Sequence, residues 1–140
     1  MGERFARLLL VLLIVQGLPV GLWAAIAPRS FYDDFPGGGR AWVAADGPYN
    51  EHLVRDFGSL YLGLTAVTLV ALLLMSWALI VAAAAGWIVF DVPHLVYHLR
   101  HLDVYGTGDQ VANVVTLVLG LALPVALLIA GRAVRPAAPG

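Results

Sequence analysis

Long blocks of apolar residues dominate the pattern along the chain, and they predict four membrane-spanning helices. The expected spans are residues 5–27, 51–75, 77–102 and 110–131. A helix rises about 1.5 Å per residue, so roughly 20 residues cross the ~30 Å hydrocarbon layer of a bilayer. Each block is long enough to do so. The expected fold class is therefore all-α: an integral membrane four-helix bundle that forms one domain over residues 1–140.

The boundary between the second and third spans has no charged residue to mark it. The chain runs from Phe57 to Phe90 without a charge. One continuous helix over residues 51–102 would be about 78 Å long, far more than a bilayer is thick. The chain must therefore fold back within this block. We expect the turn at residues 75–77, Met-Ser-Trp, with Trp77 anchored at the interface, in preference to residues 84–86, Ala-Ala-Gly.

Residues 28–50 form the only long connection. The Pro-Gly-Gly-Gly stretch at residues 36–39 predicts an irregular loop. The aromatic residues around it suggest a segment that lies in the headgroup region. These are Phe31, Tyr32, Phe35 and Trp42. After the third span, Asp109 is expected to cap the N-terminus of the fourth helix.

Composition narrows the function classes. Of the 140 residues, 61% are hydrophobic and 12% are charged, against about 25% charged in a typical soluble domain. The net charge is −1, so no basic surface would attract nucleic acid. Cysteine is absent, which excludes disulfides and thiolate metal ligands.

The arginines suggest an orientation. An even number of spans places both termini on one side of the membrane, where Arg4, Arg7, Arg132 and Arg135 would gather. The positive-inside rule assigns that side to the cytoplasm, and residues 28–50 to the outside of the cell membrane. Residues 25–27, Ala-Ile-Ala, resemble a signal-peptidase site, but the preceding apolar run is too long for a signal peptide. We expect the first helix to be retained.

The end of the third span carries a polar cluster. Asp91, His94, His98 and His101 are separated by three, four and three residues. At 100° per residue they cover an arc of about 80°, which is one helix face. Asp91 lies about 16 Å from the helix end, near the middle of the membrane. A carboxylate at that depth must be protonated, paired or bound to a cation, because an isolated one costs about 2.5–3.5 kcal/mol.

The start of the second span repeats this pattern. His52, Arg55, Asp56 and Ser59 have the spacing i, i+3, i+4, i+7 and share one face. Arg55 needs an anion, for which Asp56, Asp91 and a bound ligand are candidates. In an antiparallel helix pair the two polar faces lie at the same end. We therefore expect them to meet.

The first interpretation of this cluster is a metal site. His94 and His98 at i, i+4 can present two imidazoles to one ion. Asp91, His52 and Asp56 would complete the ligand set for Zn, Fe, Mn or Cu. Residues expected to surround these ligands are Glu51, Arg55, Tyr97 and His101.

Two other interpretations stay open. The cluster could be a polar network that only joins the second and third helices, as in a structural or accessory subunit. It could also line a pocket for a quinone or lipid, and haem would need histidines on two helices, such as His52 and His98. An enzyme, a binding or transport protein, and an accessory subunit therefore all remain possible. A homo-oligomer or a larger membrane complex is compatible with each.

The segments GLWAAIAPRSFYDDFPG and NEHLVRDFGSLYLGL, together with the span pattern, resemble small four-span DoxX-like membrane proteins of actinobacteria. The resemblance covers chain length and span pattern. It implies a four-helix bundle with a longer first extracytoplasmic loop and a link to redox or stress-related membrane complexes. It assigns no catalytic residue.

Overall fold

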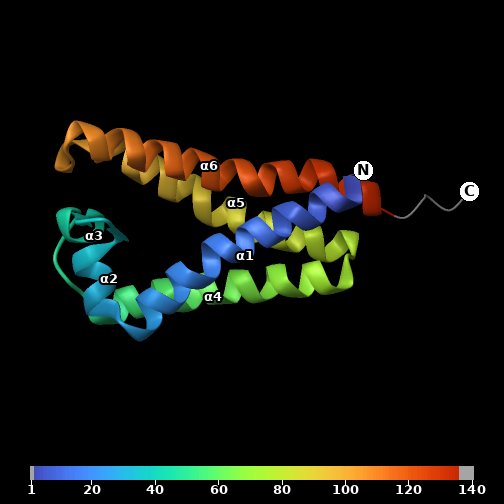
Figure 1. Cartoon of the computed structure of the whole chain (residues 1–140), viewed down its shortest axis with the longest axis horizontal. Helices are drawn as coiled ribbons and strands as arrows, with labels where there is room; N and C mark the ends of the chain where they lie inside the picture. The colour runs from blue at the N-terminus through green and yellow to red at the C-terminus, as the bar shows by residue number, and fades with distance from the viewer. Residues whose placement is uncertain (1, 136–140) are drawn as a thin grey trace, which may run out of the picture.

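The structure is a computed structural model, which describes residues 2–135 (Figure 1). Four long helices form the bundle: α1 (Gly2–Ile26), α4 (Glu51–Leu74), α5 (Trp77–Arg100) and α6 (Thr107–Gly131). Shorter elements connect them: α2 (Pro28–Asp34), β1 (Pro36–Gly37), β2 (Arg40–Ala41), α3 (Trp42–Ala45), and the 3₁₀ turns η1 (Leu102–Val104) and η2 (Arg132–Val134). The predicted all-α four-helix bundle is confirmed.

All four long helices have the length and apolar composition of membrane spans. Each also directs large apolar side chains outward, which suits a lipid environment and not water. Examples are Val15 on α1, Leu73 on α4, Val89 on α5 and Ile129 on α6. The chain is therefore a multi-pass membrane protein whose surroundings are the lipid bilayer.

The turn between α4 and α5 lies where the sequence predicts it. Met75 adopts a left-handed conformation with φ 47°, and its N–H donates to the carbonyl of Ala71 at 2.8 Å. This arrangement closes the last turn of α4, and Ser76 then leads directly into α5. Residues 84–86, the other candidate, lie inside α5.

The bundle consists of two antiparallel helix pairs. In the first pair, α1 packs on α4 so closely at Gly58 that a side chain there would touch the backbone of Ala25 and Gly21. The second pair is α5 and α6. Trp87 of α5 joins the pairs, because it is fully buried and its indole N–H donates to Thr68 Oγ1 of α4 at 2.9 Å.

The two pairs separate toward one end of the bundle. Figure 1 shows α1 and α4 close to α5 and α6 at the end that holds the chain termini, and further apart at the opposite end. Gly2 lies against Ala133, so the described ends of the chain are neighbours, as the even number of spans predicts. We call the opposite end, where the pairs diverge, the open end.

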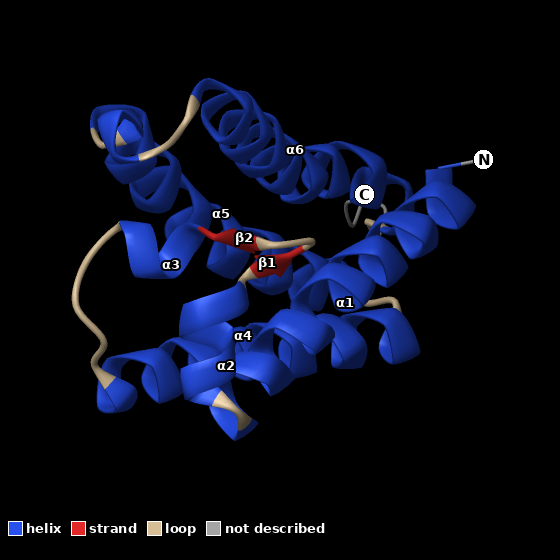
Figure 2. Cartoon of the chain, turned by 60° about the vertical axis from the view of Figure 1, so that its left-hand side comes forward, coloured by secondary structure: helices blue, strands red, loops and turns tan. Residues whose placement is uncertain are grey.

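Residues 28–50 fill the open end, and they are more ordered than the sequence suggests. They form α2, the two-stranded hairpin and α3, and Gly37, Gly38 and Gly39 supply the positive φ angles of the hairpin turn. Figure 2 shows the hairpin and α3 between the two helix pairs. The prediction that Asp109 caps α6 is wrong. The helix begins at Thr107, with Gly106 at the capping position.

Candidate functional site

A cavity of about 680 Å³ lies between the helix pairs at the open end. All four long helices contribute to its wall, and residues 28–50 cover it. Most of the lining is apolar or aromatic, which is typical of small-molecule sites. The lining residues used below are Phe31, Phe35, Trp42, Asp46, Phe57, Tyr61, Asp91, His94, Tyr97, His98, Asn113 and Gly120.

The cover contributes aromatic side chains to the cavity. Phe31 and Trp42 are both buried, and their neighbour Phe35 packs against each of them with ring centroids 4.7 and 6.3 Å apart. Phe31 also approaches Phe57 of α4 at 5.7 Å. Phe31 and Trp42 therefore point into the bundle, and the depth of this segment relative to the headgroup region stays a prediction.

Three polar contacts fasten the cover to the second helix pair. Arg40 pairs with Asp109 of α6 at 2.8 Å. The hydroxyl of Tyr97 on α5 donates to Asp46 at 3.4 Å. The hydroxyl of Tyr105 donates to the carbonyl of Trp42 at 3.2 Å, and burial together with the negative charge of Asp46 raises the pKa of Tyr105 to about 12. Tyr105 is therefore a neutral donor at physiological pH.

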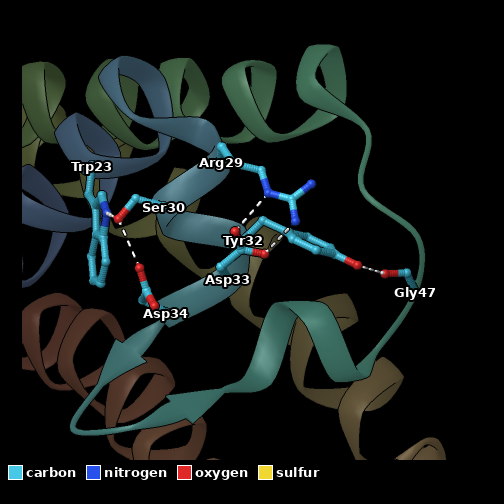
Figure 3. Close-up of polar contacts among 7 residues, drawn as sticks. All are labelled: Trp23, Arg29, Ser30, Tyr32, Asp33, Asp34 and Gly47. Carbon is cyan, nitrogen blue, oxygen red and sulfur yellow. Dashed lines mark hydrogen bonds and ion pairs between the residues drawn. The ribbon is translucent and has the colours of Figure 1, made fainter.

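The first half of the cover is held by its own contacts (Figure 3). Within α2, Arg29 forms a two-contact ion pair with Asp33, at 2.7 and 3.0 Å. Ser30 accepts from the indole of Trp23 at 3.2 Å, which links α2 to α1. Tyr32 donates to the carbonyl of Gly47 at 2.7 Å and so ties α2 to the end of the cover. The cover is thus attached both to α1 and to the second helix pair.

The polar face of α5 lines the cavity as predicted from its spacing. Asp91 lies deepest and is only 6% exposed. His94 and His98 follow toward the open end, with ring centroids 4.7 Å apart. His101 lies beyond them, where its ring stacks on Tyr97 at 4.1 Å and its Nδ1 contacts the Tyr97 carbonyl at 2.8 Å.

The cavity gathers buried polar atoms that have no hydrogen-bond partner. Within residues 2–135, four such side-chain atoms occur: Trp42 Nε1, Asp91 Oδ2, His98 Nδ1 and Asn113 Oδ1. All four residues line this one cavity. Leaving a buried polar group unpaired costs about 1–3 kcal/mol each. This grouping around one cavity is what a site for a molecule with polar atoms would show.

The polar face of α4 does not join them. The buried face of this helix carries Val54, Gly58, Tyr61, Thr65 and Thr68. His52 and Asp56 point away from the bundle, with side chains 88% and 62% exposed, and pair with each other at 3.2 Å. The expectation that they meet the polar face of α5 is wrong, because the small and apolar face of α4 packs inward instead.

Arg55 is also paired differently from the prediction. Its guanidinium contacts Glu51 at 2.9 Å and the carbonyl of Ala25 at 2.5 Å. The anion it requires is therefore Glu51 on the same helix, and neither Asp56 nor Asp91. The Ala25 contact fastens the end of α1 to the start of α4.

The five predicted metal ligands are not brought together. Across the described part of the chain, no group of three or more histidine, aspartate or glutamate side chains is arranged to hold a metal ion. Asp91, His94 and His98 share the cavity wall, whereas His52 and Asp56 lie on the outer surface of α4. Metal binding itself stays a prediction.

A second hollow of about 390 Å³ lies on the groove between α4 and α5. It is lined by Leu60, Leu64, Gly86, Val89, Phe90, Pro93 and His94. Val89 is largely exposed on the outside of the bundle, so this hollow lies on the side that meets lipid. His94 lines both spaces and stands between the cavity and the bilayer.

No family model, characterised protein or solved structure matches the chain. The structure supports the four-span plan that the DoxX-like resemblance implies. It does not show that the chain belongs to that family.

The sequence alone does not single out several cavity residues. Asn113 is not among the predicted site residues, and Trp42 is expected only in the headgroup region. Asn113 is 3% exposed and carries an amide within the apolar span α6. That position is the available signal, because a polar residue inside a membrane usually marks a functional site.

Proposed function

We propose that the protein binds an amphipathic organic molecule, of the quinone or lipid class, in the cavity at the open end. One observation carries this proposal: the four unpartnered buried polar atoms all belong to the lining of a single, otherwise apolar cavity. The apolar part of the molecule would lie among the aromatic rings. Its polar head would complete the hydrogen bonds of Asp91, His98, Asn113 and Trp42.

The size of the cavity agrees with this function. A volume of about 680 Å³ falls within the ~300–1,000 Å³ that small-molecule sites commonly have. It would hold the ring of a quinone or one chain of a lipid. Because His94 lines both the cavity and the lipid-side hollow, we propose that such a molecule enters from the bilayer past this side chain.

The orientation we propose places the termini in the cytoplasm. Arg4, Arg7, Arg132 and Arg135 belong to the end where α1 begins and the described chain ends, and positive residues favour the cytoplasmic side. The cavity would then open in the outer half of the plasma membrane, beneath an extracytoplasmic cover.

The test adds two candidate ligands and measures whether they bind. Protein in a neutral detergent is titrated with decyl-benzoquinone and with a single-chain phosphocholine lipid, and the thermal unfolding midpoint is recorded. A ligand that binds only the folded protein raises this midpoint. We expect at least one of the two probes to raise it in the wild type.

Two glycine variants locate the binding. Gly120→Leu adds a side chain toward the cavity, where Gln16 is the nearest group at 3.7 Å from an added Cβ. Gly63→Leu adds the same side chain on the exposed face of α4, where no described atom lies within 4 Å. The rise should disappear in Gly120→Leu and persist in Gly63→Leu. No rise in the wild type with any amphiphile, or an equal rise in both variants, would contradict the proposal.

A further inference from the structure

We infer that the head group the cavity selects is an organic cation, an ammonium held by Asp91. This inference rests on the proposed function, since it specifies the chemistry of the same site. It uses three properties of the lining: its charge, its hydrogen-bond acceptors and its aromatic rings.

The charge of the lining is negative. Asp46 and Asp91 both line the cavity, and among the described residues no arginine does so; the sequence contains no lysine. The nearby arginines are already engaged with other acids: Arg55 with Glu51, Arg40 with Asp109, and Arg29 with Asp33. A phosphate or carboxylate head would therefore face two acidic side chains without a guanidinium to bind it.

The deepest unpartnered atoms of the cavity are acceptors. Asp91 Oδ2 on α5 and Asn113 Oδ1 on α6 come from residues only 6% and 3% exposed, and neither atom has a partner within residues 2–135. An ammonium group carries only donors, so it can donate to acceptors of this kind. It also supplies the positive charge that a carboxylate within the membrane needs.

Aromatic rings line the same cavity as these acceptors. Phe31, Phe35, Trp42, Phe57, Tyr61 and Tyr97 all line the cavity. Aromatic faces attract cations, most strongly where water is excluded. The free indole N–H of Trp42 is a donor, so an amine that also carries a hydroxyl or carbonyl oxygen would satisfy it as well. A lipophilic amine therefore matches this lining better than an anionic lipid does.

The experiment compares amphiphiles that have the same alkyl chain and differ in their head group. Full-length protein in phosphatidylcholine nanodiscs is titrated with dodecylamine, dodecanol and dodecyl phosphate, and separately with ZnCl₂, with binding measured by calorimetry. We expect dodecylamine to bind about tenfold more tightly than dodecanol, because hydrogen bonds to a charged partner are roughly twice as strong as neutral ones. Dodecyl phosphate should bind more weakly than either.

Two isosteric variants remove one acid each. Asp91→Asn should abolish the preference for the amine and leave dodecanol binding within about twofold of the wild type. Asp56→Asn changes the net charge equally on the outer face of α4 and should keep the preference, and Asp91→Glu should restore most of it. Persistence of the preference in Asp91→Asn would show that the amine only partitions into the lipid, and would overturn the inference.

The remaining outcomes separate the two proposals. Binding of dodecanol or dodecyl phosphate that equals or exceeds that of the amine overturns the cation and leaves the amphiphile site standing. Binding of ZnCl₂ without the amine overturns it in favour of a metal ion. If none of the three amphiphiles binds and the quinone and phosphocholine titrations also fail, the proposed function itself is wrong.

Discussion

The polar residues at the start of α4 and those at the end of α5 follow the same helical spacing but have opposite surroundings. On α5, Asp91, His94 and His98 line a buried cavity. On α4, His52 and Asp56 are exposed and pair with each other. The difference shows that spacing places side chains on one face of a helix, while the packing of the other faces decides where that face points.

The packing of α4 is decided by its small residues. Gly58 allows the backbone of α1 to approach at Gly21 and Ala25, and burying this face turns His52 and Asp56 outward. On α5 no such close approach competes at the cavity end. There the polar face and the buried face are the same.

The largest expected effect comes from blocking the inward face of α4. Gly58→Leu would push a side chain into the backbone of α1, which cannot move away locally. We expect the free energy of unfolding to fall by about 3 kcal/mol, measured by titration with sodium dodecyl sulfate in mixed micelles. Gly63→Leu on the outward face is the matched control and should change it little. Equal losses in both would mean that α4 does not pack as described.

The next effect concerns the buried acid of α5. Asp91→Leu removes a carboxylate oxygen that lacks a partner within residues 2–135. Since a charge within the membrane costs about 2.5–3.5 kcal/mol, we expect the ligand-free protein to become more stable by about 2 kcal/mol in the same titration while it loses binding. Asp56→Leu on α4 should not stabilise the protein. A destabilised Asp91→Leu would indicate that Asp91 already has a structural partner.

Breaking the exposed contact between His52 and Asp56 should have a small effect on stability. His52→Ala removes the contact to Asp56 at 3.2 Å between two exposed side chains. Exposed pairs of this kind contribute about 0.3–0.5 kcal/mol, so the free energy of unfolding should change by no more than that. A loss above about 1 kcal/mol would show that this face is covered, for instance by a second copy of the chain.

The smallest expected effect is that of His52 and Asp56 on metal content. If the protein retains a metal ion, we expect it beside His94 and His98, because His52 and Asp56 lie on the outer surface of α4. Replacing both His52 and Asp56 with Ala should then leave its amount unchanged. Replacing His94 and His98 with Ala should remove it. Inductively coupled plasma mass spectrometry of untagged protein measures both. A loss of metal in the His52 and Asp56 variant would restore the predicted five-residue site.

The sequence predicts most span ends well because they lie near charges, prolines or glycines, although the end of α4 and the start of α5 have no such marker. The turn at Met75 also follows from a physical limit, since no helix could cross the bilayer with the whole of residues 51–102. The α5 part of the site is predictable for the same reason: an acid and two histidines on one face of a membrane helix need shelter from lipid.

The rest of the site depends on packing that the pattern along the chain does not contain. Both faces of α4 repeat with the helical period, so periodicity alone cannot choose between them. Gly58 is a signal for the inward face, although the polar pattern predicts that the opposite face points inward. For Phe31 and Trp42, an aromatic residue in a loop is compatible with either the headgroup region or a cavity lid. Only the fold of residues 28–50 shows that both side chains point into the bundle.

The divergence of the two helix pairs has a consequence for the surrounding bilayer. A bundle that is broader at its open end displaces more lipid area in one leaflet than in the other. Compression of that leaflet opposes the separation of the pairs, and expansion favours it. We therefore expect lipids of different intrinsic curvature to change ligand occupancy without contacting the site.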